Sequence, residues 1–103
     1  MMGFQDLLKQ AQEVRDRMER LQEELGARTV EGSAGGGMVV AVMNGRQELL
    51  DLRIEKEVVD PEGVGMLRDL VRAAVNDALA RSREMAAAEL TKLTGGILPP
   101  GIF

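Results

Sequence analysis

The sequence lacks the residue types on which most catalytic and metal sites depend. Its 103 residues include no cysteine and no histidine, which excludes disulfides, thiol nucleophiles, the usual general base and the commonest metal ligands. There is no tryptophan or tyrosine, and the two phenylalanines, Phe4 and Phe103, lie at opposite ends of the sequence. We therefore do not expect nucleic-acid bases to stack on an aromatic platform.

Long apolar runs are also missing. No stretch approaches the ~20 apolar residues of a membrane span, and the first residues lack the basic-then-apolar order of a secretion signal. We therefore expect a cytoplasmic protein with no membrane partner. Apolar residues make up 45% of the chain, charged residues make up 29%, and the net charge is −4, as in an ordinary globular domain.

Apolar residues recur at helical spacing near the start of the chain. Steps of four, three, four, three and four residues separate the members of this stripe, which are Leu7, Ala11, Val14, Met18, Leu21 and Leu25. The spacing predicts a helix over about residues 5–25, ended by Gly26. We expect the stripe to pack in the core; the alternatives are a coiled-coil seam and a partner-binding face.

The middle of the chain has the alternation that is typical of strands. Three strands are predicted over about residues 27–33, 38–43 and 48–55. Asn44-Gly45 predicts a tight hairpin with both residues at positive φ. The apolar positions predicted to pack in the core or in a dimer interface are Val39, Ala41, Met43, Leu50, Leu52 and Ile54. Val40 and Val42 make the opposite strand face apolar as well, so it needs a cover, either the first helix or another subunit.

A second, longer helix is predicted over about residues 61–94. Asp60 is a suitable N-cap and Pro61 suits the first helical position. Its stripe is Val64, Leu67, Val71, Ala74, Ala78, Arg81, Met85 and Ala88, and the packing candidates on it or beside it are Leu67, Leu70, Val71 and Ala74. A helix of ~50 Å is too long to be covered by its own chain, which predicts a homodimer. Residues 97–103 are predicted to form a non-helical tail.

The remaining motifs do not support an enzyme. The glycine-rich segment 32–37 lies between two strands and is followed by Met38, whereas a phosphate-binding loop needs a Lys-Ser or Lys-Thr pair and a helix. Glu55, Glu57 and Asp60 lack a regular metal-ligand spacing and are interpreted as a solvated strand end. No histidine could activate a serine. We predict no catalytic residue, no metal, no cofactor and no small-molecule substrate.

The basic side chains are the remaining candidates for a binding site. Seven of them lie in the two predicted helices and could contact DNA phosphates: Lys9, Arg15, Arg17, Arg20, Arg81, Arg83 and Lys92. Acidic residues stand four positions away from several of them, as in Glu13 and Arg17 or Asp77 and Arg81. The alternative is therefore a solvated helix surface on which charges pair along the helix.

Several motifs follow one another in a recognisable order. They are Leu7-Leu8-Lys9-Gln10-Ala11-Gln12, Gly37-Met38-Val39-Val40-Ala41-Val42-Met43-Asn44-Gly45, Asp60-Pro61-Glu62, Met66-Leu67-Arg68-Asp69-Leu70-Val71, Ala73-Ala74-Val75-Asn76-Asp77-Ala78, Leu93-Thr94-Gly95-Gly96 and Pro99-Pro100-Gly101. In combination and order, these motifs resemble the bacterial YbaB/EbfC family of nucleoid-associated proteins. Residues 1–96 would form a single domain of that family. The position of Val40 is often Lys in relatives, so this chain has lost a surface base there.

The resemblance implies both a fold and a function. The fold is α/β (α+β), with an N-terminal helix, a three-stranded antiparallel sheet and a long C-terminal helix, in a tweezer-like homodimer. The function is binding of double-stranded DNA with low sequence preference in the cytoplasm and nucleoid, with an effect on nucleoid organisation and gene expression. The family is also associated with recombination and replication. The alternative function is a protein–protein adaptor for recombination, repair or replication machinery.

Overall fold

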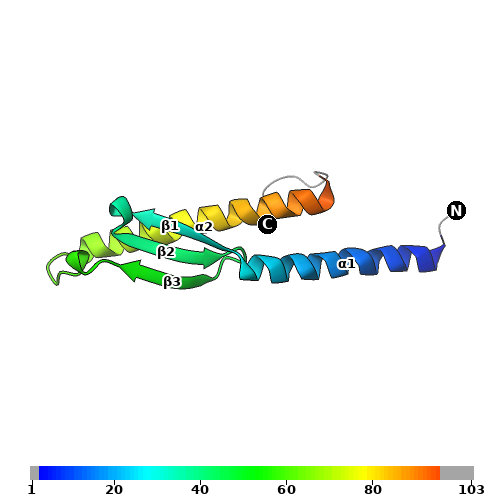
Figure 1. The fold of residues 1–103 in the computed structure, drawn as a ribbon, viewed down its shortest axis with the longest axis horizontal. Coiled ribbons are helices and arrows are strands. Elements are labelled where there is room, and N and C mark those ends of the chain that lie inside the picture. The colour runs from blue at the N-terminus through cyan, green and yellow to red at the C-terminus, as the bar shows by residue number, and fades with distance from the viewer. Residues whose placement is uncertain (1–2, 96–103) are drawn as a thin grey trace.

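A computed structural model describes residues 3–95, in which one long helix packs along a small sheet and the other extends away from the end of that sheet (Figure 1). The elements are α1 (Phe4–Ala27), β1 (Thr29–Ala34), β2 (Val39–Asn44), β3 (Leu49–Ile54) and α2 (Val64–Thr94), with single 3-10 turns at Gly35–Gly37 and Lys56–Val58. The strands form one antiparallel sheet in the order β1-β2-β3. The predicted order of an N-terminal helix, a three-stranded antiparallel sheet and a long C-terminal helix is confirmed. The predicted tail, residues 97–103, lies outside the described residues.

The central strand supplies the core of the sheet. Val39, Ala41 and Met43 are buried in one cluster with Ala74 and other residues of α2, as predicted. Val40 and Val42 point to the other face and are half-buried. Helix α1 does not cover that face, because it leaves the end of the sheet and extends away from it (Figure 1). The open face is therefore accessible to another molecule.

The edge strand β3 departs from the prediction of core packing. Leu52 is half-buried against the core, whereas Leu50 is 53% exposed and Ile54 is 37% exposed. Two physical causes account for the difference. Helix α2 packs on β1 and β2, so it does not cover β3. A register shift between Val42 and Met43 also makes Leu50 the extra residue of a bulge, which interrupts the simple alternation.

Helix α2 buries a line of mostly small residues. The first of them pack against the sheet and the later ones pack against α1. The buried residues are Ala74, Ala78, Ser82, Ala86 and Leu90, and Leu67, Leu70 and Val71 pack beside the first of them as half-buried residues. Ala74 and Ala78 face the sheet, whereas Ala86 and Leu90 face α1. The predicted continuation through Arg81, Met85 and Ala88 is wrong, because steps of four rotate the buried line by ~40° each. The second half of α2 is thus covered by its own chain, contrary to expectation.

Helix α1 packs only through its last turns. Leu21 and Leu25 are buried against Ala86 and Leu90, with Met18 partly buried beside them. The earlier part of the stripe is exposed, so the expectation of core packing is correct only from Met18 onward. The helix also continues through Gly26 to Ala27, so the prediction that Gly26 ends it is wrong. Packing against α2 stabilises the last turn despite the glycine.

The start of α2 differs from the predicted N-cap. Gly63 is the N-cap, and residues 60–63 form a turn before the helix. The Gly63 N–H donates to the Asp60 carbonyl at 2.9 Å, and the Glu62 N–H donates to Asp60 Oδ1 at 3.0 Å. Asp60 therefore orders the turn instead of capping the helix, and Pro61 lies outside the first helical turn.

The hairpin between β2 and β3 is organised by Asn44. Its Oδ1 accepts hydrogen bonds from the N–H groups of Arg46 and Glu48, both at 3.0 Å, and its Nδ2 donates to the Gly26 carbonyl at 3.2 Å. Among the non-glycine residues of the described chain, only Gln47 has a positive φ, of 64°. Gly45 does not have one, so the predicted two-residue turn is wrong. Gly45 is required for another reason, which is its close approach to α1.

Gly45→Val is expected to destabilise the protein by about 1–3 kcal/mol, the usual cost of overpacking. A Cβ atom at this position would lie 2.8 Å from Leu25 Cδ2 and 3.0 Å from the Leu25 carbonyl oxygen. Urea denaturation followed by circular dichroism measures the change. Gly65→Val is the control, because a Cβ there meets only a flexible Arg68 side chain at 4.0 Å. Coincident unfolding curves for wild type and Gly45→Val would contradict this explanation.

Candidate nucleic-acid interface

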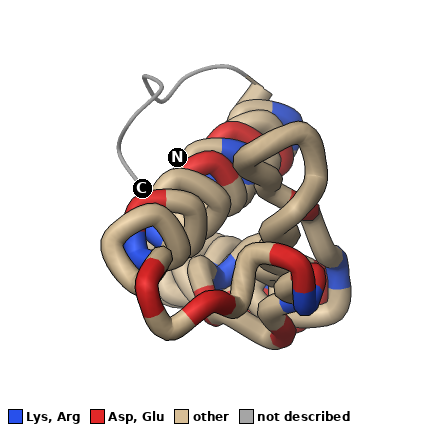
Figure 2. The backbone as a smooth tube through the Cα atoms, turned by 90° about the vertical axis from the view of Figure 1, so that its left-hand side faces the viewer, with Lys and Arg blue, Asp and Glu red and all other residues tan. Residues whose placement is uncertain are grey.

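The second half of α2 lies beside α1 and forms with it a two-helix arm that leaves the sheet (Figure 1). We define the arm as α1 together with residues 81–94 of α2. Its root is the buried cluster of Leu21, Leu25, Ala86 and Leu90. Viewed along the molecule, positive and negative positions are interspersed around the backbone (Figure 2). Any anion site must therefore come from a local arrangement of cations.

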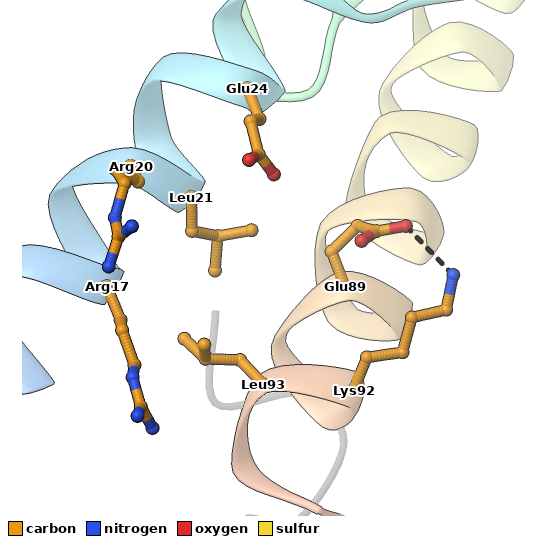
Figure 3. Close-up of a pocket in the computed structure, with 7 residues that line it drawn as sticks. All are labelled: Arg17, Arg20, Leu21, Glu24, Glu89, Lys92 and Leu93. Atoms are coloured by element: carbon orange, nitrogen blue, oxygen red, sulfur yellow. Dashed lines mark hydrogen bonds and ion pairs between the residues drawn. The ribbon is translucent and has the colours of Figure 1, made fainter.

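Such an arrangement lines a cleft between the two helices of the arm. The cleft has a volume of about 320 Å³ and is lined by Arg17, Arg20, Leu21, Glu24, Glu89, Lys92 and Leu93. Leu21 and Leu93 point toward each other across it (Figure 3). Three cations and two carboxylates surround this apolar centre. Helix α1 supplies both arginines and α2 supplies the lysine, so three of the predicted DNA-binding residues line one cleft of the arm.

Glu89 of α2 pairs with Arg28, the C-cap residue of α1, and with Lys92 of its own helix. Its Oε1 accepts hydrogen bonds from Arg28 Nη1 at 2.6 Å and Lys92 Nζ at 3.2 Å. The Arg28 hydrogen bond, and then that of Lys92, lowers the pKa of the Glu89 carboxyl below its ordinary value. Part of the Lys92 charge is therefore already compensated within the protein, so Lys92 is the weakest of the three cations as a phosphate ligand.

The remaining predicted DNA-binding residues lie outside the cleft. Arg15 faces Glu19, with 3.9 Å between Nε and Oε1, and Arg81 pairs with Asp77 at 3.4 Å. Arg81 and Lys92 also line a second cleft, of about 580 Å³, beside β1. Arg83 is exposed and follows the buried Ser82, so it lies on the opposite flank of α2 from Arg81.

Lys9 lies on the exposed first half of α1. Among the ion pairs between described residues, none involves Lys9, Arg17, Arg20 or Arg83. These four cations therefore have no carboxylate within ion-pair distance among the described residues. The two of them that face one cleft are Arg17 and Arg20.

Arg28, which directly follows α1, is a residue of this region that the sequence did not indicate. It is the C-cap residue of α1, and its pairing with Glu89 joins positions 61 apart in the chain. No local spacing predicts such a contact. The only available signal was an arginine at the end of a predicted helix, where a cation is favoured by the helix dipole.

A second carboxylate, Asp77, links α2 to β1 through a hydrogen bond. Its Oδ2 accepts a hydrogen bond from the Ser33 backbone N–H at 3.0 Å. This hydrogen bond, helped by the charge of Arg81, lowers the pKa of the Asp77 carboxyl below its ordinary value, against a smaller opposing effect of desolvation. The ionised form of Asp77 therefore stabilises the contact between β1 and α2.

The two lowered pKa values predict a loss of stability in acid. A group whose pKa is lower in the folded state contributes stability above its unfolded pKa, and that contribution disappears as the pH falls through the folded value. The loss should begin near pH ~4, where unperturbed carboxyls titrate. The variant Asp77→Asn/Glu89→Gln should be less stable than wild type at pH 7, and its melting temperature should fall less steeply between pH 5 and pH 2.

The matched control for this acid titration is Glu13→Gln. Glu13 is exposed on α1 and forms no ion pair among the described residues. Its variant should keep the pH dependence of wild type in melts followed by circular dichroism. Equal slopes in wild type and in the Asp77/Glu89 variant would show that these carboxylates do not stabilise the fold.

Other kinds of site receive no support from the described part of the chain. Within residues 3–95, no three Asp or Glu side chains come together in a way that could hold a metal ion, and this includes Glu55, Glu57 and Asp60. Neither α1 nor α2 combines the length and the apolar character that a membrane-spanning helix needs.

Comparisons with known proteins identify relatives over nearly the whole chain. The YbaB/EbfC DNA-binding family model matches residues 1–97. A nucleoid-associated protein of Syntrophobacter fumaroxidans is 54% identical over 97% of this chain and 90% of its own. Another, from Pelotomaculum thermopropionicum, is 49% identical over 100% of both chains. The crystal structure of an uncharacterized protein from Helicobacter pylori has the same fold, with a TM-score of 0.82 at 24% identity over 92% of this chain and 100% of that one.

Proposed function

Because the chain belongs to the YbaB/EbfC DNA-binding family, we propose that it binds double-stranded DNA as a homodimer and contacts phosphates through its two-helix arm. It is a nucleoid-associated DNA-binding protein, the description that its relatives carry, and it belongs to a DNA-binding family and not to a family of enzymes. Its place of action is the nucleoid in the cytoplasm. Contacts to phosphates carry no sequence information, so the proposal includes low sequence preference.

The cations of the cleft are the observation that carries this proposal. Arg17 and Arg20 line the open cleft between α1 and α2, and no carboxylate among the described residues forms an ion pair with either. A guanidinium presents five N–H donors in a plane, which suits phosphate oxygens. The net charge of −4 opposes approach of a duplex, but the local potential at the arm decides the contact. We therefore expect binding that is weak and strongly salt-dependent.

The shape of the chain and its exposed apolar residues support a homodimer. The radius of gyration is 19.1 Å, and the described chain extends over 71 × 21 × 16 Å, whereas a compact domain of this length has a radius of ~13 Å. Large apolar side chains are exposed between residues 49 and 66, namely Leu49, Leu50, Ile54, Val59, Val64 and Met66. A two-fold axis through this region would cover them and would carry two arms, as in a tweezer.

Light scattering of the wild-type protein is expected to give about twice the chain mass of 11.2 kDa at micromolar concentration. Leu50→Asp/Ile54→Asp should shift the population toward monomers, because two charges cannot be buried in an apolar interface. Leu8→Asp is the control, since Leu8 is 49% exposed on the arm and lies away from the proposed interface. A folded wild-type monomer, or a Leu50/Ile54 variant that remains fully dimeric, would contradict the proposed interface.

Fluorescence anisotropy with two duplexes of unrelated sequence tests the function. Both duplexes should bind with similar affinity, and log affinity should fall linearly with log salt, with a slope of about −0.9 for each phosphate contacted. A strong preference for one duplex would contradict low specificity. The absence of binding at low salt would contradict the function itself and favour an adaptor for recombination, repair or replication proteins.

A further inference from the structure

The first half of α1 carries an apolar stripe on which nothing packs among the described residues. Leu7, Ala11 and Val14 continue the seam that packs against α2 farther along the helix, yet Leu7 is 54% exposed and Val14 is 58% exposed. The reason is that α2 ends at Thr94, while α1 extends beyond that end (Figure 1). Helix α2 therefore covers only the second half of the apolar stripe on α1.

We propose that residues 97–103 of the same chain dock along this stripe and complete the arm. This segment contains four large apolar side chains, Ile97, Leu98, Ile102 and Phe103, and no charged side chain. Pro99 and Pro100 favour an extended backbone, which can lie along a helix without competing for its hydrogen bonds. The segment is therefore suited to an apolar helix face, because burying its apolar side chains removes little favourable hydration.

The direction and the length of the chain match this docking. Helix α1 runs toward the sheet and α2 runs away from it, so the C-terminal end of α2 is directed toward the free end of α1 (Figure 1). Gly95, with a φ of 65°, ends α2 in a left-handed conformation. Residues 96–103 span up to ~26 Å when extended, and the helix rise from Met18 to Leu7 is ~16 Å. The segment can therefore reach the whole stripe.

Continuity with an existing interface favours this occupant over a separate protein. Leu93, close to the end of α2, already packs against the cluster that contains Leu21 and Leu90. A segment tethered there has an effective concentration in the millimolar range at the neighbouring stripe, which a free partner rarely reaches. Docking would also stiffen the first half of α1, since a helix with no tertiary packing is only marginally stable in water. This role is independent of DNA binding.

Disulfide trapping tests the docking directly, because the chain has no native cysteine. The test protein carries Ala11→Cys and Ile102→Cys, which place one thiol on the stripe and one in the segment. The control carries Asp16→Cys and Ile102→Cys, because Asp16 lies ~180° around the helix from Leu7. Both proteins are oxidised with glutathione disulfide, and the products are separated on a non-reducing gel.

The Ala11 pair is expected to form an intrachain disulfide at least about tenfold faster than the Asp16 pair. Equal rates would overturn the proposal. A preferential disulfide between two chains would also overturn it, since the stripe would then be covered by a second copy. In the chain without added cysteines, Leu98→Asp/Phe103→Asp should accelerate hydrogen exchange of residues 4–16 and leave residues 64–80 unchanged. Unaltered exchange in residues 4–16 would contradict the docking independently of any cysteine.

Discussion

Gly32→Ala is expected to destabilise the protein by more than about 3 kcal/mol, beyond the usual cost of overpacking. A Cβ atom on Gly32 would lie 2.1 Å from the Ala78 nitrogen, 2.5 Å from the Ala74 carbonyl oxygen and 2.6 Å from Ala78 Cα. All three are backbone atoms, so no side chain can rotate away. Strand β1 and helix α2 would have to separate, and their contact holds the sheet against the helix.

Urea denaturation should compare Gly32→Ala with Gly65→Ala. The comparison isolates the effect of the close contact between Gly32 and the backbone of α2. Both variants carry the same chemical change, but Gly65 is an exposed residue of α2. Gly65→Ala should gain about 0.5–1 kcal/mol from helix propensity. A small domain has only about 5–15 kcal/mol of total stability, so Gly32→Ala should lose a large share of it. If Gly32→Ala unfolded at the same urea concentration as wild type, the packing of β1 on α2 would be described incorrectly.

Arg17→Gln/Arg20→Gln is expected to have the largest effect on DNA binding. In a dimer this variant removes four cations from the two arms, so the slope of log affinity against log salt should flatten by about 0.9 for each phosphate that the arms no longer neutralise. Affinity at low salt should fall by at least about tenfold, and equally for two unrelated duplexes, because phosphates are common to all sequences. Anisotropy over a salt series measures both quantities.

The control for this variant is Arg68→Gln/Arg72→Gln, which removes the same charge from another part of the molecule. Both arginines lie near the start of α2 and pair with Asp69, with 3.2 and 3.1 Å between nitrogen and oxygen. Their replacement should change the affinity much less. Equal reductions in affinity for the two variants would mean that overall charge, and not the arm, determines binding. Unchanged binding in both would leave Arg17 and Arg20 as solvated surface.

The fold was predictable because its signals are local. The seam from Leu7 to Leu25 predicts α1, the alternation around Val39 predicts β2, and the spacing after Pro61 predicts a long helix. What could not be predicted depends on tertiary packing. Gly26 stays helical because α2 supports the last turn of α1, and the buried line of α2 rotates because its partner changes from the sheet to α1.

The candidate site was only partly predictable for the same reason. The seven basic residues could be named, but sequence spacing could not show which of them keep their charge free. Glu13 stands four residues before Arg17, yet the structure has no ion pair between them, whereas the pair of Asp77 and Arg81 is present at 3.4 Å. The contact of Arg28 with Glu89 and the cleft between the helices both join distant parts of the chain. Such arrangements arise only when the arm is assembled.

The central claim is that the arm is the surface that meets DNA, and nuclear magnetic resonance tests it most directly. A short duplex is titrated into labelled wild-type protein at low salt, while backbone amide signals and the arginine Nε–H signals are followed. Changes should concentrate in α1 and residues 81–94 and include the side-chain signals of Arg17 and Arg20. Changes confined to the sheet around Val40 and Val42, or to the loop 35–37, would contradict the account.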